Sequence, residues 1–108
     1  MRKFLYFQNS TSDNITVNVD HISMMDATGA DEMKIYFRSN DAVDFSGAAN
    51  ISITSGYAKQ FIRALTKEIA FGRTPFIVVA DDTNSDFFTS TADGTTVAAT
   101  ACGTIVLT

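Results

Sequence analysis

The sequence predicts a mainly β fold with one helix, in which a strongly bent antiparallel sheet forms a small barrel. Short segments of alternating apolar and polar residues recur along the chain between clusters of turn-forming residues, and this pattern is typical of half-buried strands. Only residues 57–73 show the apolar spacing of an amphipathic helix. After His21 the alternation slips by one position, which predicts a bulge or sharp bend that curls the sheet rather than leaving a flat sandwich.

The first half of the chain is predicted to form four strands, each bounded by turn residues. They are expected at residues 2–8, 15–19, 33–38 and 43–53. Gly47 is a point at which the fourth strand could be interrupted. Because the connecting turns are short, neighbouring strands are expected to pair antiparallel.

The helix predicted at residues 57–73 has three distinct sides. Ser55 is the expected N-cap, Gly72 the expected C′ residue, and Pro75 prevents continuation. The apolar side should pack on the sheet and consists of Ala58, Phe61, Ile62, Leu65 and Ile69. The two flanks consist of Lys59, Arg63 and Lys67 on one side and of Tyr57, Ala64 and Phe71 on the other.

The last third of the chain is predicted to complete the sheet. Residues 76–80 form a continuous apolar run, which indicates a strand covered on both faces. A polar loop follows, and residues 87–108 indicate two further strands around Asp93-Gly94 and Gly103. No linker or repeat interrupts the 108 residues, so the whole chain is expected to form a single domain.

The sequence has no residue pattern of a catalytic site, and we expect the protein not to be an enzyme. His21 is the single histidine and lies at the predicted strand bend, outside any Ser-His-Asp or Cys-His arrangement. Cys102 is the only cysteine, which rules out an internal disulfide and a cysteine-based zinc cage. Its small neighbours favour a buried, inert thiol.

The polar loop after residue 80 carries the best metal-ligand pattern. Asp82, Asn84 and Asp86 follow the D-x-N-x-D rhythm of a calcium loop, and Asp93 falls at the twelfth position. The sixth position, which requires Gly, is Phe87, and the twelfth lacks the usual Glu. We therefore expect a solvated turn with no metal or cofactor, and cation binding by this loop is the alternative.

The sequence shows no signal for export or membrane insertion. The apolar run at residues 4–7 is too short for a signal peptide, and the later run at residues 75–80 is too short to span a bilayer. A cytoplasmic protein or a small virion component is therefore expected.

Positive charge is concentrated on the predicted helix. The chain has a net charge of −4, yet residues 57–73 carry four bases against Glu68, a local charge of +3, while the rest carries −7. The four bases are Lys59, Arg63, Lys67 and Arg73. Half of all positive charge on one element points to a polyanion or an acidic partner.

A second cationic pattern lies on a predicted strand. Lys34, Tyr36 and Arg38 share one strand face, and an aromatic ring between cations suits stacking on unpaired bases and pairing with phosphates. Arg2, Phe4, Tyr6 and Gln8 share a face in the same way. The alternative is a solvated helix face with ordinary cross-strand pairs, and the acidic net charge argues against a general nucleic-acid binder.

Self-association is indicated by the composition and by two apolar features. Hydrophobic residues make up 45% of the chain and charged residues only 19%, which favours apolar subunit contacts. The chain ends on an apolar strand, whose edge must pair with a neighbouring subunit or close inside the same barrel. The flank Tyr57, Ala64 and Phe71 is a second contact surface, unless it completes the core.

These patterns resemble the Sm-like (LSm-type) small proteins of marine cyanophages and ocean metagenomes. The resemblance lies in the opening FLYFQNSTSDNITVNVDHI and in the helix YAKQFIRALTKEIA after ISITSG, within the first 80 residues or so. It implies a strongly bent five-stranded antiparallel (SH3-type) barrel, a ring-forming homo-oligomer and RNA or DNA binding in an infected host cell. The helix follows the fourth predicted strand, whereas the Sm helix precedes the first. The Asp/Asn and Arg-Gly motifs of Sm RNA-binding loops have no counterparts, so no family RNA-binding residue is carried over.

The leading hypothesis is an Sm-like homo-oligomer that binds RNA or single-stranded DNA through clustered bases. The residues expected to bind nucleic acid are Lys59, Arg63, Lys67, Arg73, Lys34, Tyr36 and Arg38. The alternative is a structural or assembly protein, such as a virion component, that does not bind nucleic acid.

Overall fold

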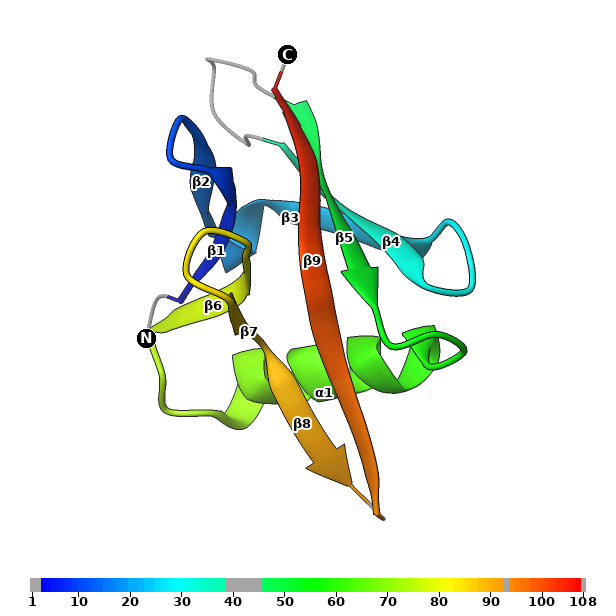
Figure 1. The fold of residues 1–108 in the computed structure, drawn as a ribbon. Helices are drawn as coiled ribbons and strands as arrows, with labels where there is room; N and C mark the ends of the chain where they lie inside the picture. The colour runs from blue at the N-terminus through cyan, green and yellow to red at the C-terminus, as the bar shows by residue number, and fades with distance from the viewer. Residues whose placement is uncertain (1–2, 39–45, 93, 108) are drawn as a thin grey trace.

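The structure, a computed structural model, describes residues 3–38, 46–92 and 94–107. Within these residues the chain forms nine strands, one α-helix and one short 3-10 helix (Figure 1). In chain order the elements are β1 (Phe4–Ser10), β2 (Asp13–Asn18), η1 (Val19–His21), β3 (Ile22–Ala27), β4 (Glu32–Arg38), β5 (Ser46–Ile53), α1 (Ala58–Phe71), β6 (Phe76–Asp81), β7 (Asp86–Phe87), β8 (Thr89–Ala92) and β9 (Thr95–Leu107).

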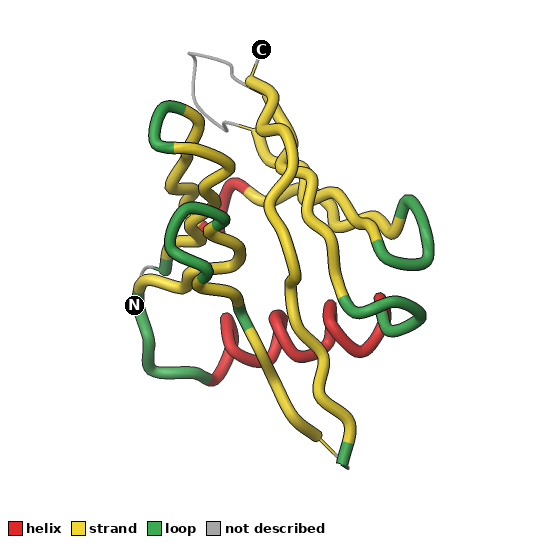
Figure 2. The backbone as a smooth tube through the Cα atoms, in the orientation of Figure 1, coloured by secondary structure: helices red, strands yellow, loops and turns green. Residues whose placement is uncertain are grey.

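The strands form two sheets that are joined by bent strands. One sheet has the order β2-β1-β6-β7 and the other the order β3-β4-β5-β9-β8. β2 continues into β3 through η1 alone, and β7 continues into β8 across the single residue Phe88. The strand neighbours therefore form a closed circuit, as in a small barrel. This confirms the predicted fold, and the bend expected near His21 is η1 (Figure 2).

One strand pair is parallel, which differs from the expectation of antiparallel pairing throughout. β1 pairs antiparallel with β2 but parallel with β6, where Leu5 lies opposite Ile77. The two strands are separated by more than 60 residues that include α1, so no short turn constrains their direction. Short turns determine the pairing of consecutive strands, whereas a long crossover permits parallel neighbours.

The inner faces of the two sheets meet in one apolar core. Along β4, Met33, Ile35 and Phe37 are buried and alternate with more exposed polar residues, as the two-residue period of a strand requires. α1 closes one end of the barrel, opposite the turn between β1 and β2 (Figure 1). Its Phe61 is fully buried and meets the ring of Phe88 edge-on at a centroid distance of 5.7 Å.

Both ends of the helix differ from the sequence prediction. α1 spans Ala58–Phe71 rather than residues 57–73, and its N-cap is Tyr57, which makes no side-chain capping bond, rather than Ser55. Gly72 is the C-cap with an extended backbone (φ −71°), not the left-handed C′ residue expected. The ammonium of Lys3 donates to the carbonyl oxygens of Glu68 at 2.9 Å and Gly72 at 2.6 Å. The Glu68 carbonyl also accepts from the Gly72 N–H at 2.9 Å, so Lys3 is a second donor to Glu68 and supplies a donor to the Gly72 carbonyl, which lies just beyond the helix.

The C-terminal segment forms β8 and β9, joined at Gly94 as predicted, but Gly103 lies inside β9 rather than at a strand end. The register between β5 and β9 shifts at this point, and a Cβ on Gly103 would lie 3.3 Å from Cβ of Asn50. Glycine therefore marks a bulge with close backbone approach. β9 pairs with β8 at Thr95–Ala98 and with β5 from Ala99 to Leu107, so its C-terminal part is paired within the chain along the edge that faces β5. β5 also runs through Gly47 without a break.

Candidate nucleic-acid and assembly surfaces

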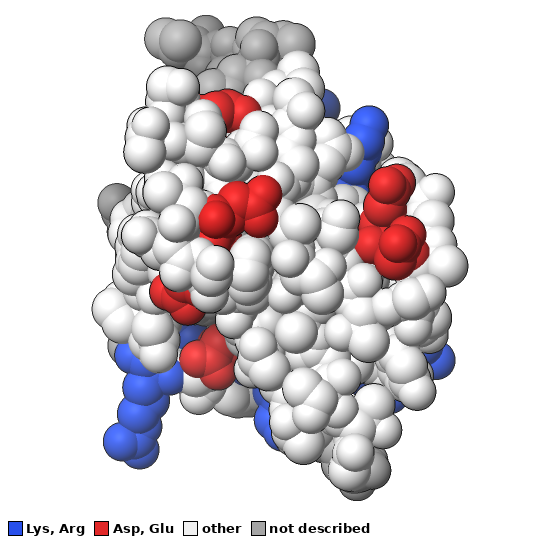
Figure 3. Space-filling model, in the orientation of Figure 1, with Lys and Arg blue, Asp and Glu red and all other residues white. Residues whose placement is uncertain are grey.

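The first candidate surface is the cation row Lys59, Arg63 and Lys67 on α1. All three residues are exposed and follow one another at i, i+4 spacing, so they lie on one side of the helix, about 6 Å apart along its axis. Arg73 is exposed in the segment that follows the helix. Within the described residues none of these four bases forms an ion pair. Figure 3 shows basic side chains projecting at the helix end of the molecule, further basic atoms at the upper right, and several acidic patches spread over the visible face.

The second candidate surface is the outer face of β4. Lys34, Tyr36 and Arg38 share this face, as predicted, because the residues between them point into the core. Asp26 lies directly opposite Lys34 on β3, and Glu32 precedes Lys34 by two residues on the same side. The charges on this face therefore balance. α1 packs against β9, and the structure does not join the cations of β4 to those of the helix.

An apolar row crosses the same outer face over four strands. The backbone register places Met24 opposite Tyr36, Tyr36 opposite Ala48, and Ala48 opposite Val106. Met24 and Val106 are 51% and 47% exposed, although both are large apolar side chains. Of these residues, only Tyr36 was predicted to lie on an exposed binding face. Met24 follows the phase slip in the alternation of apolar residues. Val106 lies in the C-terminal segment, for which the sequence predicted only a strand with an edge to pair.

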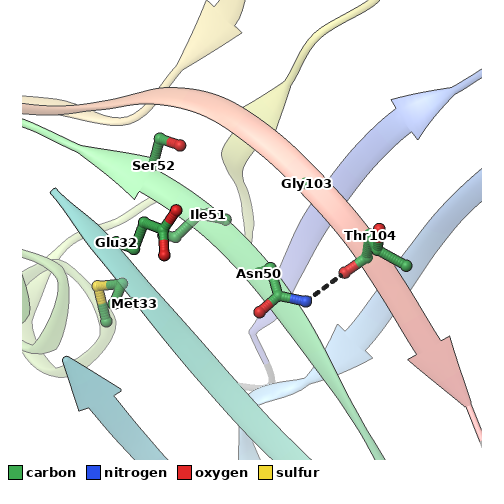
Figure 4. Close-up of a pocket in the computed structure, with 7 residues that line it drawn as sticks. All are labelled: Glu32, Met33, Asn50, Ile51, Ser52, Gly103 and Thr104. Atoms are coloured by element: carbon green, nitrogen blue, oxygen red, sulfur yellow. Dashed lines mark hydrogen bonds between the residues drawn. The ribbon is translucent and has the colours of Figure 1, made fainter. Parts of the chain in front are cut away.

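A shallow hollow of about 180 Å³ lies beside this row (Figure 4). It is lined by Glu32, Met33, Asn50, Ile51, Ser52, Gly103 and Thr104. The Asn50 side-chain amide donates to the Thr104 carbonyl at 3.0 Å, which fixes the floor between β5 and β9. Small residues at Ser52 and Gly103 leave the space, and Glu32 is the one charged residue among the described residues that line it.

A third surface is aromatic and lies on the outside of the four-stranded sheet. Tyr6 on β1 and Phe76 on β6 have ring centroids 5.4 Å apart, and the Tyr6 hydroxyl donates to the side-chain oxygen of Gln8. Phe76 is 46% exposed, so the prediction that its strand is covered on both faces is wrong at this end. Ile77 and Val79 face the core. Their burial explains why this strand is apolar, although its outer face is exposed at Phe76.

The flank Tyr57, Ala64 and Phe71 does not complete the core. Phe71 is 82% exposed and Tyr57 is also exposed, while Ala64 is half-buried. An aromatic ring this exposed at the end of a helix is one apolar group available to a partner.

The loop after β6 uses its acidic residues within the chain. The carboxylate of Asp81, which is buried, accepts from the backbone amides of Thr83 and Asn84 at 3.0 and 3.1 Å and from the Asn84 side chain at 2.9 Å. The Asn84 side-chain bond, with these backbone bonds, holds the pKa of Asp81 below its ordinary value against the opposing effect of burial. Asp82 accepts from the amide of Cys102 at 3.1 Å. The described residues contain no group of three or more acidic, His or Cys side chains arranged for a metal, and Asp93 lies outside them.

Cys102 is buried, as predicted from its neighbours. Burial, with the negative charges of Asp82 and Asp13, raises the pKa of its thiol to about 11, so the thiolate needed for reaction is scarce at neutral pH. His21 is the last residue of η1 and is half-buried.

No helix in the described part of the chain has the length and apolar character needed to cross a membrane. Comparison of the chain with known proteins gives no match: no family model, no curated protein and no solved structure is significantly similar to it.

Proposed function

We propose that this protein is a homo-oligomeric module of the Sm-like kind that binds RNA or single-stranded DNA on the exposed side of α1. The proposal depends on the cation row Lys59, Arg63 and Lys67, which is exposed and has no ion-pair partner among the described residues. In a chain of net charge −4, bases left unneutralised on one element keep a local positive potential for a polyanion. The proposed setting is the cytoplasm of an infected host cell or the virion.

The bases of β4 are not part of this proposed binding surface. Asp26 and Glu32 balance Lys34 and Arg38 on their own face, and acidic groups beside a site repel phosphates. Arg73 follows the helix and adds a fourth exposed base. Four phosphate contacts on a single strand give a salt slope of about −3, so affinity should fall roughly 50-fold between 50 and 200 mM salt.

The test is fluorescence anisotropy with labelled oligo-U and oligo-dT at increasing salt. The double change Lys59→Gln with Arg63→Gln should lower affinity at least 10-fold at low salt. It should also make the salt slope shallower by about 1.4, because two phosphate contacts are lost.

The matched control is Thr11→Glu with Ser12→Glu, which changes the net charge by the same amount. Both residues are exposed in the turn between β1 and β2, at the end of the molecule opposite α1 (Figure 1), and the salt slope should stay as in wild type. The nucleic-acid proposal would be contradicted if the two double changes altered affinity and salt slope equally. It would also be contradicted if the wild type did not bind the oligonucleotides at 50 mM salt.

A structural or assembly role without nucleic acid is the second candidate. The exposed ring of Phe71 on the flank that does not complete the core supports it. In that case the wild type retains no oligonucleotide, and Phe71→Ser lowers the mass of the assembly in light scattering.

A further inference from the structure

The outer face of β4 carries a self-complementary order of side chains. Glu32, Lys34, Tyr36 and Arg38 share this face, and Ile35 is the midpoint of the set. Glu32 and Arg38 lie equally far from Ile35 along the strand, on opposite sides of it. Lys34 and Tyr36 also lie equally far from Ile35, on opposite sides of it. We propose that this face binds the same face of a second copy of the chain, with the two β4 strands antiparallel.

A two-fold axis that crosses the strands at the level of Ile35 generates the contact. It places Arg38 of one copy opposite Glu32 of the other and Tyr36 opposite Lys34, and each contact is made twice because the interface is isologous. Facing sheets lie about 10 Å apart with strands nearly aligned. Arginine and carboxylate form the strongest such ion pairs, and an ammonium group is attracted to the face of a tyrosine ring.

The pairing also involves the apolar row and the hollow. Met24, Tyr36, Ala48 and Val106 form a row across the face, in which Ala48 is already buried. Under this axis the facing sheet would cover the part of the row around Tyr36 with Lys34 and Asp26 of the second copy. Under the same axis, Arg38 of the second copy approaches the rim of the hollow, where Glu32 supplies the acidic group.

Glu32 and Arg38 cannot form an ion pair with each other within one chain. They lie six residues apart on one strand, a separation of about 20 Å at the rise of a β-strand. Both are exposed and neither has an ion-pair partner among the described residues. A second copy brings each of them a partner of opposite charge.

Charge balance favours a copy of the chain over a nucleic acid as the occupant. Asp26 and Glu32 offset Lys34 and Arg38 on this face, and a polyanion would meet repulsion at Glu32. A copy of the same face supplies both signs of charge in the order that the pairing requires.

The inference rests on the self-association in the proposed function and names its interface. The test measures mass by light scattering and sedimentation for the wild type, Arg38→Glu, Glu32→Arg and the double exchange. Each single change places like charges opposite each other and should weaken association at least 10-fold. The double exchange restores opposite charges in both symmetric pairs and should recover the wild-type association.

The matched control is Lys59→Glu, which makes the same charge change as Arg38→Glu on α1 and should leave the association unchanged. A wild type that stays at the 11.7 kDa of one chain at hundreds of micromolar would overturn both the self-association and this interface. An assembled wild type whose mass ignores the single changes, or a double exchange that fails to rescue, would overturn the interface alone. Loss of oligonucleotide binding by Tyr36→Ala with unchanged mass would assign the face to nucleic acid instead.

Discussion

The ammonium of Lys3 donates a hydrogen bond of 2.9 Å to the backbone carbonyl of Glu68, and this bond joins the segment before β1 to the last turn of α1. The same ammonium reaches the carbonyl of Gly72, and the Lys3 side chain is only 6% exposed. A cation at the negative end of the helix dipole is stabilising, and here it acts together with the N–H of the C-cap residue Gly72, which donates to the same Glu68 carbonyl.

Replacing Lys3 by methionine should therefore destabilise the fold while keeping the buried aliphatic stem. Two hydrogen bonds from a charged donor are lost, and the expected decrease in the free energy of unfolding is about 2 kcal/mol. Urea unfolding followed by circular dichroism measures it. The control Lys59→Met removes an exposed ammonium and should change stability by less than about 0.5 kcal/mol. Equal effects of the two changes would contradict the capping role of Lys3.

The glycines on either side of α1 should respond differently to alanine. Gly56 has φ +81°, and a side chain there costs about 1–2 kcal/mol. Gly72 has φ −71°, and the three atoms nearest to an added Cβ all belong to the end of the flexible Glu68 side chain. Gly72→Ala should therefore be neutral or stabilise by up to about 1 kcal/mol. A larger loss for Gly72→Ala than for Gly56→Ala in thermal unfolding would argue for the left-handed cap expected from the sequence.

The strands and the helix were predictable because each depends on a local periodicity. The alternation along β4 is sufficient to place Lys34, Tyr36 and Arg38 on one face, and the helical period is sufficient to place Lys59, Arg63 and Lys67 on another. The phase slip after His21 was sufficient to locate η1.

The features that the sequence did not reveal depend on contacts between distant residues. The capping of α1 by Lys3 joins positions 65 residues apart, and the parallel pairing of β1 with β6 leaves no local pattern. Gly103 resembles a turn residue until its strand is paired with β5, where it is a bulge. The apolar row of Tyr36, Met24 and Val106 exists only once the register of four strands is known.

The thiol of Cys102 should be unreactive in the folded protein. It is buried, and burial with the charges of Asp82 and Asp13 raises its pKa to about 11, so little thiolate is present or accessible at pH 8. A disulfide reagent should give almost no colour with the native protein and one equivalent per chain in urea. Fast reaction of the native protein at pH 8 would show that β9 opens readily or that the thiol is exposed.

Two phenylalanines of α1 should differ strongly in their effect on stability. Phe61 is fully buried against Phe88, and Phe61→Ala should cost about 3–5 kcal/mol through lost burial and a cavity. Phe71 is 82% exposed, and Phe71→Ala should stay within about 0.5 kcal/mol when measured at a concentration where the chain is monomeric. A large loss for Phe71→Ala under that condition would mean that its flank packs within the chain.

Asp81 should make stability depend on pH in the acid range. Its carboxylate accepts three hydrogen bonds, from the amides of Thr83 and Asn84 and from the Asn84 side chain, and the Asn84 side chain is the main cause of its lowered pKa. A lowered pKa in the folded state means that the unfolded state binds the proton more readily, so the contribution to stability is complete above about pH 5. It is lost as the pH falls below about 4 through the folded-state pKa.

Asp81→Asn should therefore be less stable than wild type at pH 7, and the two urea midpoints should converge toward pH 3. The control Asp86→Asn changes an exposed carboxylate and should follow the wild-type curve. If the urea midpoints of Asp81→Asn and wild type differed by the same amount from pH 7 to pH 3, the loss of stability would come from the changed shape of the side chain rather than from the lost charge of Asp81.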